Sequence, residues 1–371
     1  MIVTLQDPYT GDTHKLDLDD DSTVRDIALQ VVSDLSLDNT PQFFTYFKQE
    51  HADELSSRTI VDGEKVVLPD DLTATEIMAF LRDPELPVYY QSKDIDENLL
   101  FQFRTDRLNR AGYDTDLLNE KCVLLCGVGL LGNEIAMNLA VLGVGKIILM
   151  DYGHVDWYNI YRQPLFGRDD VYKTKVEAVS DKLNGMGKID AEPVYVEIPC
   201  LATEPDKIAV FERLKTINSH VKASDLVIGA LDIFSGRAVA QILARHNGKP
   251  FVSSSVDAWG GKTNVYFPDE NNCYCCGISP GSFADGGACT LAAIEAQKTV
   301  VAMATRFSVD CLLGKDIEFN EIKYYAGKME LKKSKVMGTP KCRICGDNGL
   351  KAQDNKQAFE FIYNWLFGKV S

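Results

Sequence analysis

Hydrophobic residues change their spacing in a repeating order between residues 122 and 231. Residues 122–126 form a short apolar run, and helical spacing follows over residues 133–142. Residues 146–150 and 225–231 are two further apolar runs. Short apolar runs that alternate with helical segments are typical of parallel strands buried on both faces. The pattern therefore predicts an α/β fold with a mainly parallel sheet.

The first 90 or so residues show a different pattern, which predicts a separate module. Residues 1–6 and 14–18 alternate between apolar and polar positions around turn-forming residues, as in a hairpin. Ser22 precedes a helically spaced segment over residues 23–35. Further short segments have strand-like or helical spacing, at residues 43–47, 66–68 and 73–81. This order favours a small α+β domain of the ubiquitin-like β-grasp type over residues 1–92, and a plain stabilising appendage is the alternative.

Three glycines follow the first apolar run, at Gly127, Gly129 and Gly132. Glycines at this spacing form a tight turn and let the backbone approach phosphate oxygens at a helix N-terminus. Asp151 ends the second run about 20 residues later, where an acidic side chain would meet a ribose hydroxyl. These features predict a Rossmann-like nucleotide site. Taken alone, they favour an NAD-dependent dehydrogenase.

Polar and cationic residues after Asp151 argue for a different reaction. Asn159, Arg162 and Gln163 follow within a dozen residues, and Lys175 lies thirteen residues beyond Arg162. Hydride transfer needs no such cations. A reaction at the phosphates does, because an arginine and a lysine can hold a triphosphate and neutralise charge on departing pyrophosphate.

The third apolar run ends in Asp232, and Arg237 lies five residues further on. A carboxylate at the carboxyl end of such a strand is well placed to hold Mg²⁺. Each of these charges taken singly is better explained as a solvated surface residue. Their joint placement at strand ends is what favours a site.

Ten cysteines include two pairs with metal-ligand spacing. Cys273 and Cys276 form one pair, Cys342 and Cys345 form the other, and 65 residues separate them. The spacing predicts a structural zinc site with four thiolate ligands, rather than free thiols or a disulfide. Such a site would link the two ends of the long segment between Cys276 and Cys342. Cys275 is an alternative ligand to either neighbour.

Cys289 lies in the small-residue stretch GSFADGGACT, directly before helical patterning over residues 291–306. A cysteine at a helix entrance is partly exposed, and the helix dipole favours its thiolate. The pattern alone fits a nucleophile and a buried small residue equally well.

Composition excludes some classes of function. The net charge of −15 over 371 residues argues against a nucleic-acid partner, whose footprint would be basic. No apolar stretch is long enough to cross a membrane, and the cysteine usage fits a reducing compartment. We therefore expect a cytoplasmic protein.

The aromatic-rich segment 357–367 predicts a helix in a C-terminal tail, residues 348–371. Its aromatic side chains favour packing against the protein over docking of a partner.

The ordered motifs over roughly residues 100–347 resemble the superfamily of ubiquitin-activating enzymes and ThiF/MoeB-type adenylyltransferases. They are the GVGLLG loop, Asp151 with Asn159 and Arg162-Gln163, Lys175, the segment from Asp232 to Arg237, and the paired cysteines. RQPL at residues 162–165 and DGGACTL around Cys289 look most like the autophagy-type activating enzyme. The chain departs from the common pattern at Ile233 and Ser235, which follow Asp232.

The resemblance implies an adenylation domain over residues 93–347 that uses ATP. A ubiquitin-like protein with a free C-terminal glycine would be adenylated, captured as a thioester on Cys289 and passed to a conjugating enzyme. It implies phosphate roles for Lys175, Arg162 and Arg107, a ribose role for Asp151 and a magnesium role for Asp232. Arg107 would act in the partner subunit's ATP site of a homodimer, and a surface helix with spaced charges explains it equally well.

Three alternatives remain. A sulfur-carrier adenylyltransferase would form the adenylate without a thioester on Cys289. A non-catalytic scaffold would have no reason to keep Arg162, Lys175 and Asp232 together. A dehydrogenase would need an acid/base pattern beside the nicotinamide, and none can be located. The N-terminal module would recruit the conjugating enzyme or regulate access to the site.

Overall fold

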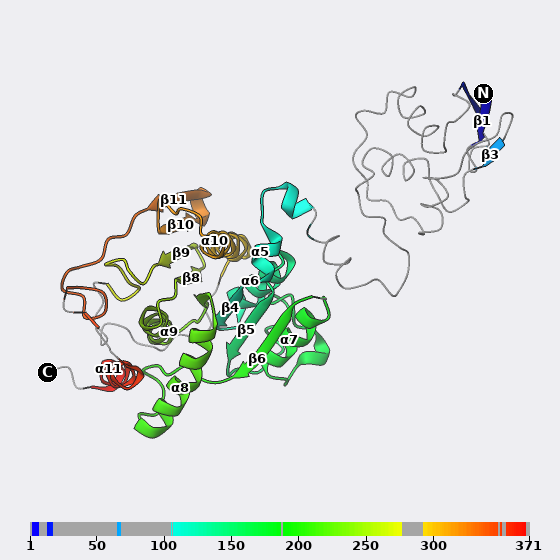
Figure 1. Ribbon diagram of the computed structural model, residues 1–371. Coiled ribbons are helices and arrows are strands. Elements are labelled where there is room, and N and C mark those ends of the chain that lie inside the picture. Colours follow the sequence, from blue (N-terminus) through cyan, green and yellow to red (C-terminus); the bar gives the residue numbers. More distant parts are fainter. Residues whose placement is uncertain are drawn as a thin grey trace. The chain divides into compact units, whose positions relative to one another are not determined.

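The computed structural model describes residues 2–6, 13–17, 65–67, 105, 107–186, 188–276, 292–347, 349–350 and 354–368. The chain divides into two units, Met1–Phe103 and Arg104–Ser371. Figure 1 shows the described helices and strands of each unit.

Three short strands are described in the first unit. β1 (Ile2–Gln6) pairs antiparallel with β2 (Thr13–Asp17), and β3 (Lys65–Val67) lies parallel to β1 on its other side. The hairpin and the strand near residue 66 therefore match the predicted pattern. The other predicted segments lie outside the described residues, so the β-grasp fold stays a prediction.

An eight-stranded sheet forms the centre of the second unit (Figure 1). Its strands are β4 (Cys122–Cys126), β5 (Lys146–Asp151), β6 (Asp190–Tyr195), β7 (Leu226–Gly229), β8 (Phe251–Asp257), β9 (Gly260–Tyr266), β10 (Glu321–Tyr325) and β11 (Glu330–Ser334). β6, β5, β4, β7 and β8 are mutually parallel in that spatial order, and β9, β10 and β11 continue the sheet antiparallel. The sheet is thus Rossmann-like and mainly parallel, as predicted, and the strand order changes direction at β4.

Helices cover both faces of the parallel part. Their bounds are α5 (Thr115–Asn119), α6 (Leu130–Val141), α7 (Lys175–Asn184), α8 (Lys207–Ala223), α9 (Phe234–His246), α10 (Ile294–Leu312) and α11 (Asn355–Phe367), with short 3₁₀ helices η2 (Arg168–Asp170) and η4 (Ala326–Lys328). α6, α7 and α10 pack on one face of the sheet, and α8 and α9 pack on the other with α11 outside them.

The apolar run in β4 is explained by this three-layer arrangement. Val123 and Leu125 belong to the core beneath α6, α7 and α10, whereas Leu124 and Cys126 belong to the core beneath α8 and α9. Successive side chains of a strand point to opposite faces, so a strand covered on both faces has no polar side. Burial raises the pKa of the Cys126 thiol to about 12, as expected for a packing residue.

Three predicted elements have boundaries that differ from the structure. α6 begins at Leu130, three residues before the predicted start, because the helix follows directly on Gly129. β7 ends at Gly229 instead of residue 231, because Ala230 and Leu231 leave the sheet and line a pocket. α10 also begins later and ends later than the predicted helix over residues 291–306.

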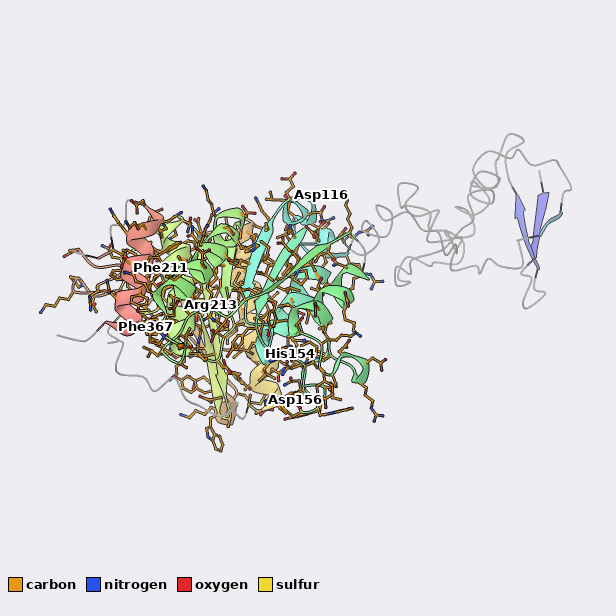
Figure 2. All side chains as sticks on the ribbon, turned by 90° about the horizontal axis from the view of Figure 1, so that it is seen from below. Asp116, His154, Asp156, Phe211, Arg213 and Phe367 are labelled. Carbon is orange, nitrogen blue, oxygen red and sulfur yellow. The ribbon has the colours of Figure 1, made fainter. Side chains whose placement is uncertain are left out.

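The C-terminal helix α11 packs as the sequence favoured. Phe359, Ile362, Trp365 and Leu366 are buried in the core shared with α8 and α9. Figure 2 labels Phe367 of α11 and Phe211 of α8. The Phe211 ring meets the Phe359 ring edge-on, with ring centres 6.0 Å apart. Of the helices that the structure describes, none combines the length and the hydropathy of a membrane span.

Candidate active site

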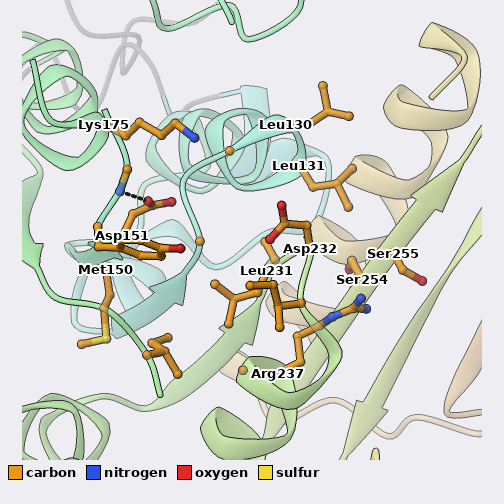
Figure 3. A pocket seen from close by; sticks show the side chains of 18 of the residues that line it. Leu130, Leu131, Met150, Asp151, Lys175, Leu231, Asp232, Arg237, Ser254 and Ser255 are labelled. Atoms are coloured by element: carbon orange, nitrogen blue, oxygen red, sulfur yellow. Dashed lines mark hydrogen bonds between the residues drawn. The ribbon is translucent and has the colours of Figure 1, made fainter. Parts of the chain in front are cut away.

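A pocket of about 440 Å³ opens at the carboxyl ends of β4, β5 and β7. This is the point at which the strand order changes direction, where ligands bind in open α/β sheets. Seven of the predicted site residues line it, namely Gly127, Gly129, Asp151, Asn159, Gln163, Lys175 and Asp232. Figure 3 shows Asp151 and Lys175 on one side of the pocket and Asp232 with Arg237 on the other.

Each glycine of the loop between β4 and α6 meets a different steric demand. Gly127 has a φ of +91°, and a Cβ there would lie 2.7 Å from the carbonyl oxygen of Ala230. A Cβ at Gly132 would lie 1.9 Å from the carbonyl oxygen of Gly127, so this glycine permits close packing of helix and strand. No atom of the described residues lies within 4 Å of a Cβ built at Gly129, which leaves that backbone open to a phosphate.

Asp151 joins the end of β5 to the glycine loop. One carboxylate oxygen accepts a hydrogen bond from the backbone N–H of Val128 at 2.7 Å, and the other accepts from the N–H of Gly153 at 2.7 Å. Each carboxylate oxygen has two lone pairs, so acceptor capacity remains for ribose hydroxyls. The carboxylate is therefore fixed in direction before a ligand binds.

Lys175 is the first residue of α7, and its position is set by its neighbours. Thr174 caps the helix, and the Lys175 N–H donates to the carbonyl of Gly153 at 2.9 Å. The Lys175 ammonium lies beside Gly153, close to Asp151. Asp232, three residues beyond β7, is exposed at the opposite wall.

Asn159 and Gln163 are buried at the pocket wall. The Asn159 Oδ1 accepts from the N–H of Asp156 at 2.9 Å, and its carbonyl accepts from the N–H of Gln163 at 3.0 Å. The Oε1 of Gln163 is buried and has no hydrogen-bond partner within the described part of the chain. A buried amide oxygen without a partner is costly, and a ligand with an N–H group would remove that cost.

Arg237, which the sequence analysis noted beside Asp232 without assigning it a role, also lines the pocket. Its side chain is 9% exposed, and its buried Nε has no hydrogen-bond partner among the residues that the structure describes. A buried guanidinium that lacks a carboxylate partner favours an anionic ligand. The signal was present in the sequence, because Arg237 lies one turn into the helix that follows Asp232.

Three of the predicted nucleotide-site residues that the structure describes do not line the pocket, namely Gly132, Arg162 and Arg107. Gly132 lies in the first turn of α6, against the Gly127 carbonyl. The Arg162 guanidinium lies 5.5 Å from the ring centre of Tyr161, and Arg107 is exposed on the helical turn 107–110. Cys289 lies outside the described residues. The catalytic roles of Arg162, Arg107 and Cys289 stay predictions.

Sequence reasoning missed several pocket residues, including Tyr152, Tyr158, Cys200 and Ser254. Tyr152 follows Asp151 directly, so its place at the strand end could have indicated it. Cys200 and Ser254 belong to no recognised spacing pattern, and only the fold brings them to the pocket.

The four paired cysteines form one cluster. Sulfur-to-sulfur distances are 3.7 Å for Cys273 and Cys276, 3.5 Å for Cys273 and Cys342, and 3.2 Å for Cys276 and Cys345. Four thiolates around zinc, with bonds of about 2.3 Å, lie about 3.8 Å apart. The donor set and spacing fit a structural zinc, and Cys275 is not part of the cluster.

Comparison with known proteins places the chain in a family. A model of the ThiF family matches residues 104–336, which is more than half of the chain, and the protein belongs to this family. The SAMP-activating enzyme E1 of Haloferax volcanii is 26% identical over 235 residues, covering 62% of this chain and 81% of that protein.

Two further comparisons bear on the finer predictions. The ubiquitin-like modifier-activating enzyme ATG7 of Pyricularia oryzae is 31% identical over 144 residues, which is 37% of this chain and 20% of that protein. So short a match does not single out the autophagy branch. The crystal structure of Escherichia coli MccB with ATP shares the fold, with a TM-score of 0.53, 17% identity and coverage of 74% of this chain and 82% of that one.

Proposed function

We propose that this protein uses ATP to adenylate the C-terminal carboxylate of a ubiquitin-like protein. The observation that carries the proposal is the pocket itself, which gathers the glycine loop, two carboxylates and two cations at the switch point of the sheet. The SAMP-activating enzyme is named for such an activation, and membership of the ThiF family supports the same chemistry here.

The pocket residues suit this reaction in distinct ways. The substrate carboxylate attacks the α-phosphorus of ATP, the bond to the β-phosphate oxygen breaks, and pyrophosphate leaves with the electron pair. Lys175 and Arg237 would stabilise the charge on the phosphates, and Asp151 would orient the ribose. Asp232 would hold Mg²⁺, which when bound neutralises phosphate charge. Arg162, and Arg107 from the partner subunit of a homodimer, would add further positive charge.

The second step of the proposal is thioester formation on Cys289. The thiolate would attack the acyl carbon of the adenylate and release AMP, and the acyl group would then pass to a cysteine of a conjugating enzyme. The N-terminal unit would recruit that enzyme or regulate access, in a cytoplasmic protein. The alternative is a sulfur-carrier adenylyltransferase, which stops at the adenylate.

The deciding experiment measures ATP–pyrophosphate exchange with candidate ubiquitin-like proteins, together with non-reducing gels. Wild type and Cys289→Ala should both catalyse exchange, and only wild type should form a thiol-labile adduct. Cys311→Ala is the matched control, because burial raises the pKa of Cys311 to about 12 and makes it a poor nucleophile. Exchange without any adduct would favour the sulfur-carrier alternative, and no exchange with any carrier would contradict the proposal.

A further inference from the structure

Tyr274 lies between the first two thiols of the cysteine cluster and also touches the helix that forms one wall of the pocket. Its ring stacks on Phe234 of α9, with ring centres 4.9 Å apart at an interplanar angle of 29°. The Arg237 guanidinium lies over the same ring, 5.4 Å from its centre. One aromatic side chain therefore contacts both the first residue of α9 and the buried arginine of the pocket.

Among the described residues, Tyr274 is the side chain whose ring stacks on the Arg237 guanidinium. Phe234 and Arg237 are three residues apart at the start of α9, so both side chains project from the same side of the helix. The Arg237 Nε has no hydrogen-bond partner within the described residues, and no ion pair fixes the guanidinium there. The contact with the Tyr274 ring would thus orient the Arg237 guanidinium.

The backbone of Tyr274 belongs to the cysteine cluster, and its ring also meets the Tyr266 ring edge-on at 6.5 Å. Cys273 and Cys276 flank it in a single turn, closed by a hydrogen bond from the Cys276 N–H to the Cys273 carbonyl at 3.1 Å. A second turn carries Cys342 and Cys345, and the Gly346 N–H closes it on the Cys342 carbonyl at 3.0 Å. A metal bound to all four thiolates would lock the two turns together, whereas four thiolates without a metal would repel one another.

We infer that Tyr274 is a positioning residue that couples metal binding at the four-thiol site to nucleotide binding in the pocket. A bound zinc fixes the turn, the turn fixes the Tyr274 ring, and the ring holds Arg237 toward the phosphates. Because such coupling is reciprocal, nucleotide raises the affinity for zinc by the same factor. The inference rests on the nucleotide-binding part of the proposed function and goes beyond it.

The test uses the full chain and four proteins: wild type, Tyr274→Leu, Tyr274→Phe and Tyr363→Leu. Tyr363 is the matched control, because its ring lies 5.5 Å from the Lys207 ammonium on the outer layer of helices and does not line the pocket. Calorimetry gives the Kd of a non-hydrolysable ATP analogue on zinc-loaded protein. Competition with a chromophoric chelator gives the zinc Kd with and without the analogue.

In wild type, the analogue should tighten zinc binding. Tyr274→Leu should weaken analogue binding by roughly 2- to 30-fold, the range of a cation–π contact, while still binding one zinc per chain. The analogue should then no longer tighten zinc binding. Tyr274→Phe keeps the ring, so it should bind the analogue with wild-type affinity and show the same tightening of zinc binding. Tyr363→Leu should match wild type in both measurements.

A wild-type zinc affinity that is the same with and without the analogue overturns the inference, and this measurement needs no variant to fold. Normal analogue binding by folded Tyr274→Leu overturns it as well. If wild type binds no ATP analogue at all, the proposed function fails and the coupling fails with it. If wild type binds the ATP analogue but its zinc affinity does not change, the coupling fails and the proposed function stands.

Discussion

Lys175 lies at the helix start that faces the pocket, fixed by the Thr174 cap and by its own N–H bond to Gly153. Lys175→Met keeps the aliphatic stem but removes the ammonium. We expect ATP–pyrophosphate exchange to fall by about 100-fold or more, since a preorganised charge that stabilises phosphate is worth roughly 3–4 kcal/mol. Lys215→Met on α8, whose side chain is 75% exposed, should exchange like wild type. Equal rates for Lys175→Met and wild type would remove Lys175 from the site.

Asp170 is a buried carboxylate that holds the segment leading to Lys175. It accepts from the Gly167 N–H at 2.8 Å and lies 3.1 Å from the Lys173 ammonium and 3.3 Å from that of Lys182. Burial alone would raise the pKa of Asp170, but the Gly167 hydrogen bond and the two lysines outweigh it and hold the pKa below its usual value.

Asp170→Asn should therefore lower the free energy of unfolding by about 1–3 kcal/mol at neutral pH. Because the folded-state pKa is depressed, this stabilisation is present above the unfolded-state pKa of about 4 and is lost as the pH falls through the folded-state value. Thermal unfolding midpoints measured from pH 7 down to pH 3 should thus converge for variant and wild type. Asp169→Asn, the exposed neighbour, is the control and should show little difference at any pH.

For single residues, the sequence was sufficient to predict those site residues that directly follow a strand or begin a helix. Asp151, Lys175 and Asp232 each follow an apolar run or begin a helix, so their spacing alone brought them to one edge of the sheet. Arg237 is different, because its role depends on burial against Tyr274, which lies in another element. Contacts between residues so far apart in the chain leave no periodic signal.

The turn between β4 and α6 offers a matched pair of substitutions. A Cβ at Gly132 would lie 1.9 Å from the Gly127 carbonyl, so Gly132→Ala should cost about 3 kcal/mol or more of stability. Gly129 has a φ of −82°, outside the left-handed region, and its Cβ would meet no described atom within 4 Å. Gly129→Ala should therefore unfold near the wild-type temperature.

Gly129→Ala and Gly132→Ala also distinguish an effect on stability from an effect on ATP binding. The methyl group of Gly129→Ala would occupy the space through which a phosphate approaches, so the Kd for ATP should rise by about tenfold or more. Thermal unfolding and calorimetric ATP binding on both variants check this. A destabilised Gly129→Ala with normal ATP affinity would contradict the assignment of the second glycine.

Some strands of the sheet were predicted from the sequence with the correct bounds, whereas others were missed. β4 has the predicted bounds because both its faces are covered and every residue is apolar or a thiol. β8 carries Ser253, Ser254 and Ser255, and the buried Ser254 hydroxyl lies 3.2 Å from that of Thr263 on β9. Hydrogen bonds replace apolar contacts there, so hydropathy gave no sign of the strand. The antiparallel strands β9 to β11 were also missed. β9 and β10 pair across more than 50 residues of sequence, so that pairing leaves no local signal.

Charge is divided unequally between the two units of the chain. Residues 1–103 contain 22 acidic and 7 basic side chains, whereas residues 104–371 contain 32 of each. The whole net charge of −15 thus belongs to the first unit, and the unit with the pocket is neutral. The overall acidity that argues against a nucleic-acid partner therefore comes from the first unit and not from the unit that contains the pocket. Basic partner proteins would be attracted to the first unit.

A fragment of residues 104–371 tests whether adenylation needs the acidic unit. Both described cores consist of residues from this fragment, and the ThiF match begins at residue 104, so we expect it to fold cooperatively. It should keep ATP–pyrophosphate exchange within a few-fold of the full chain and bind anion-exchange resin much more weakly. Circular dichroism and exchange assays at matched ionic strength measure this. A folded fragment without exchange would show that the first unit takes part in adenylation, whereas retained exchange with loss of transfer to a conjugating enzyme would assign it to the later step.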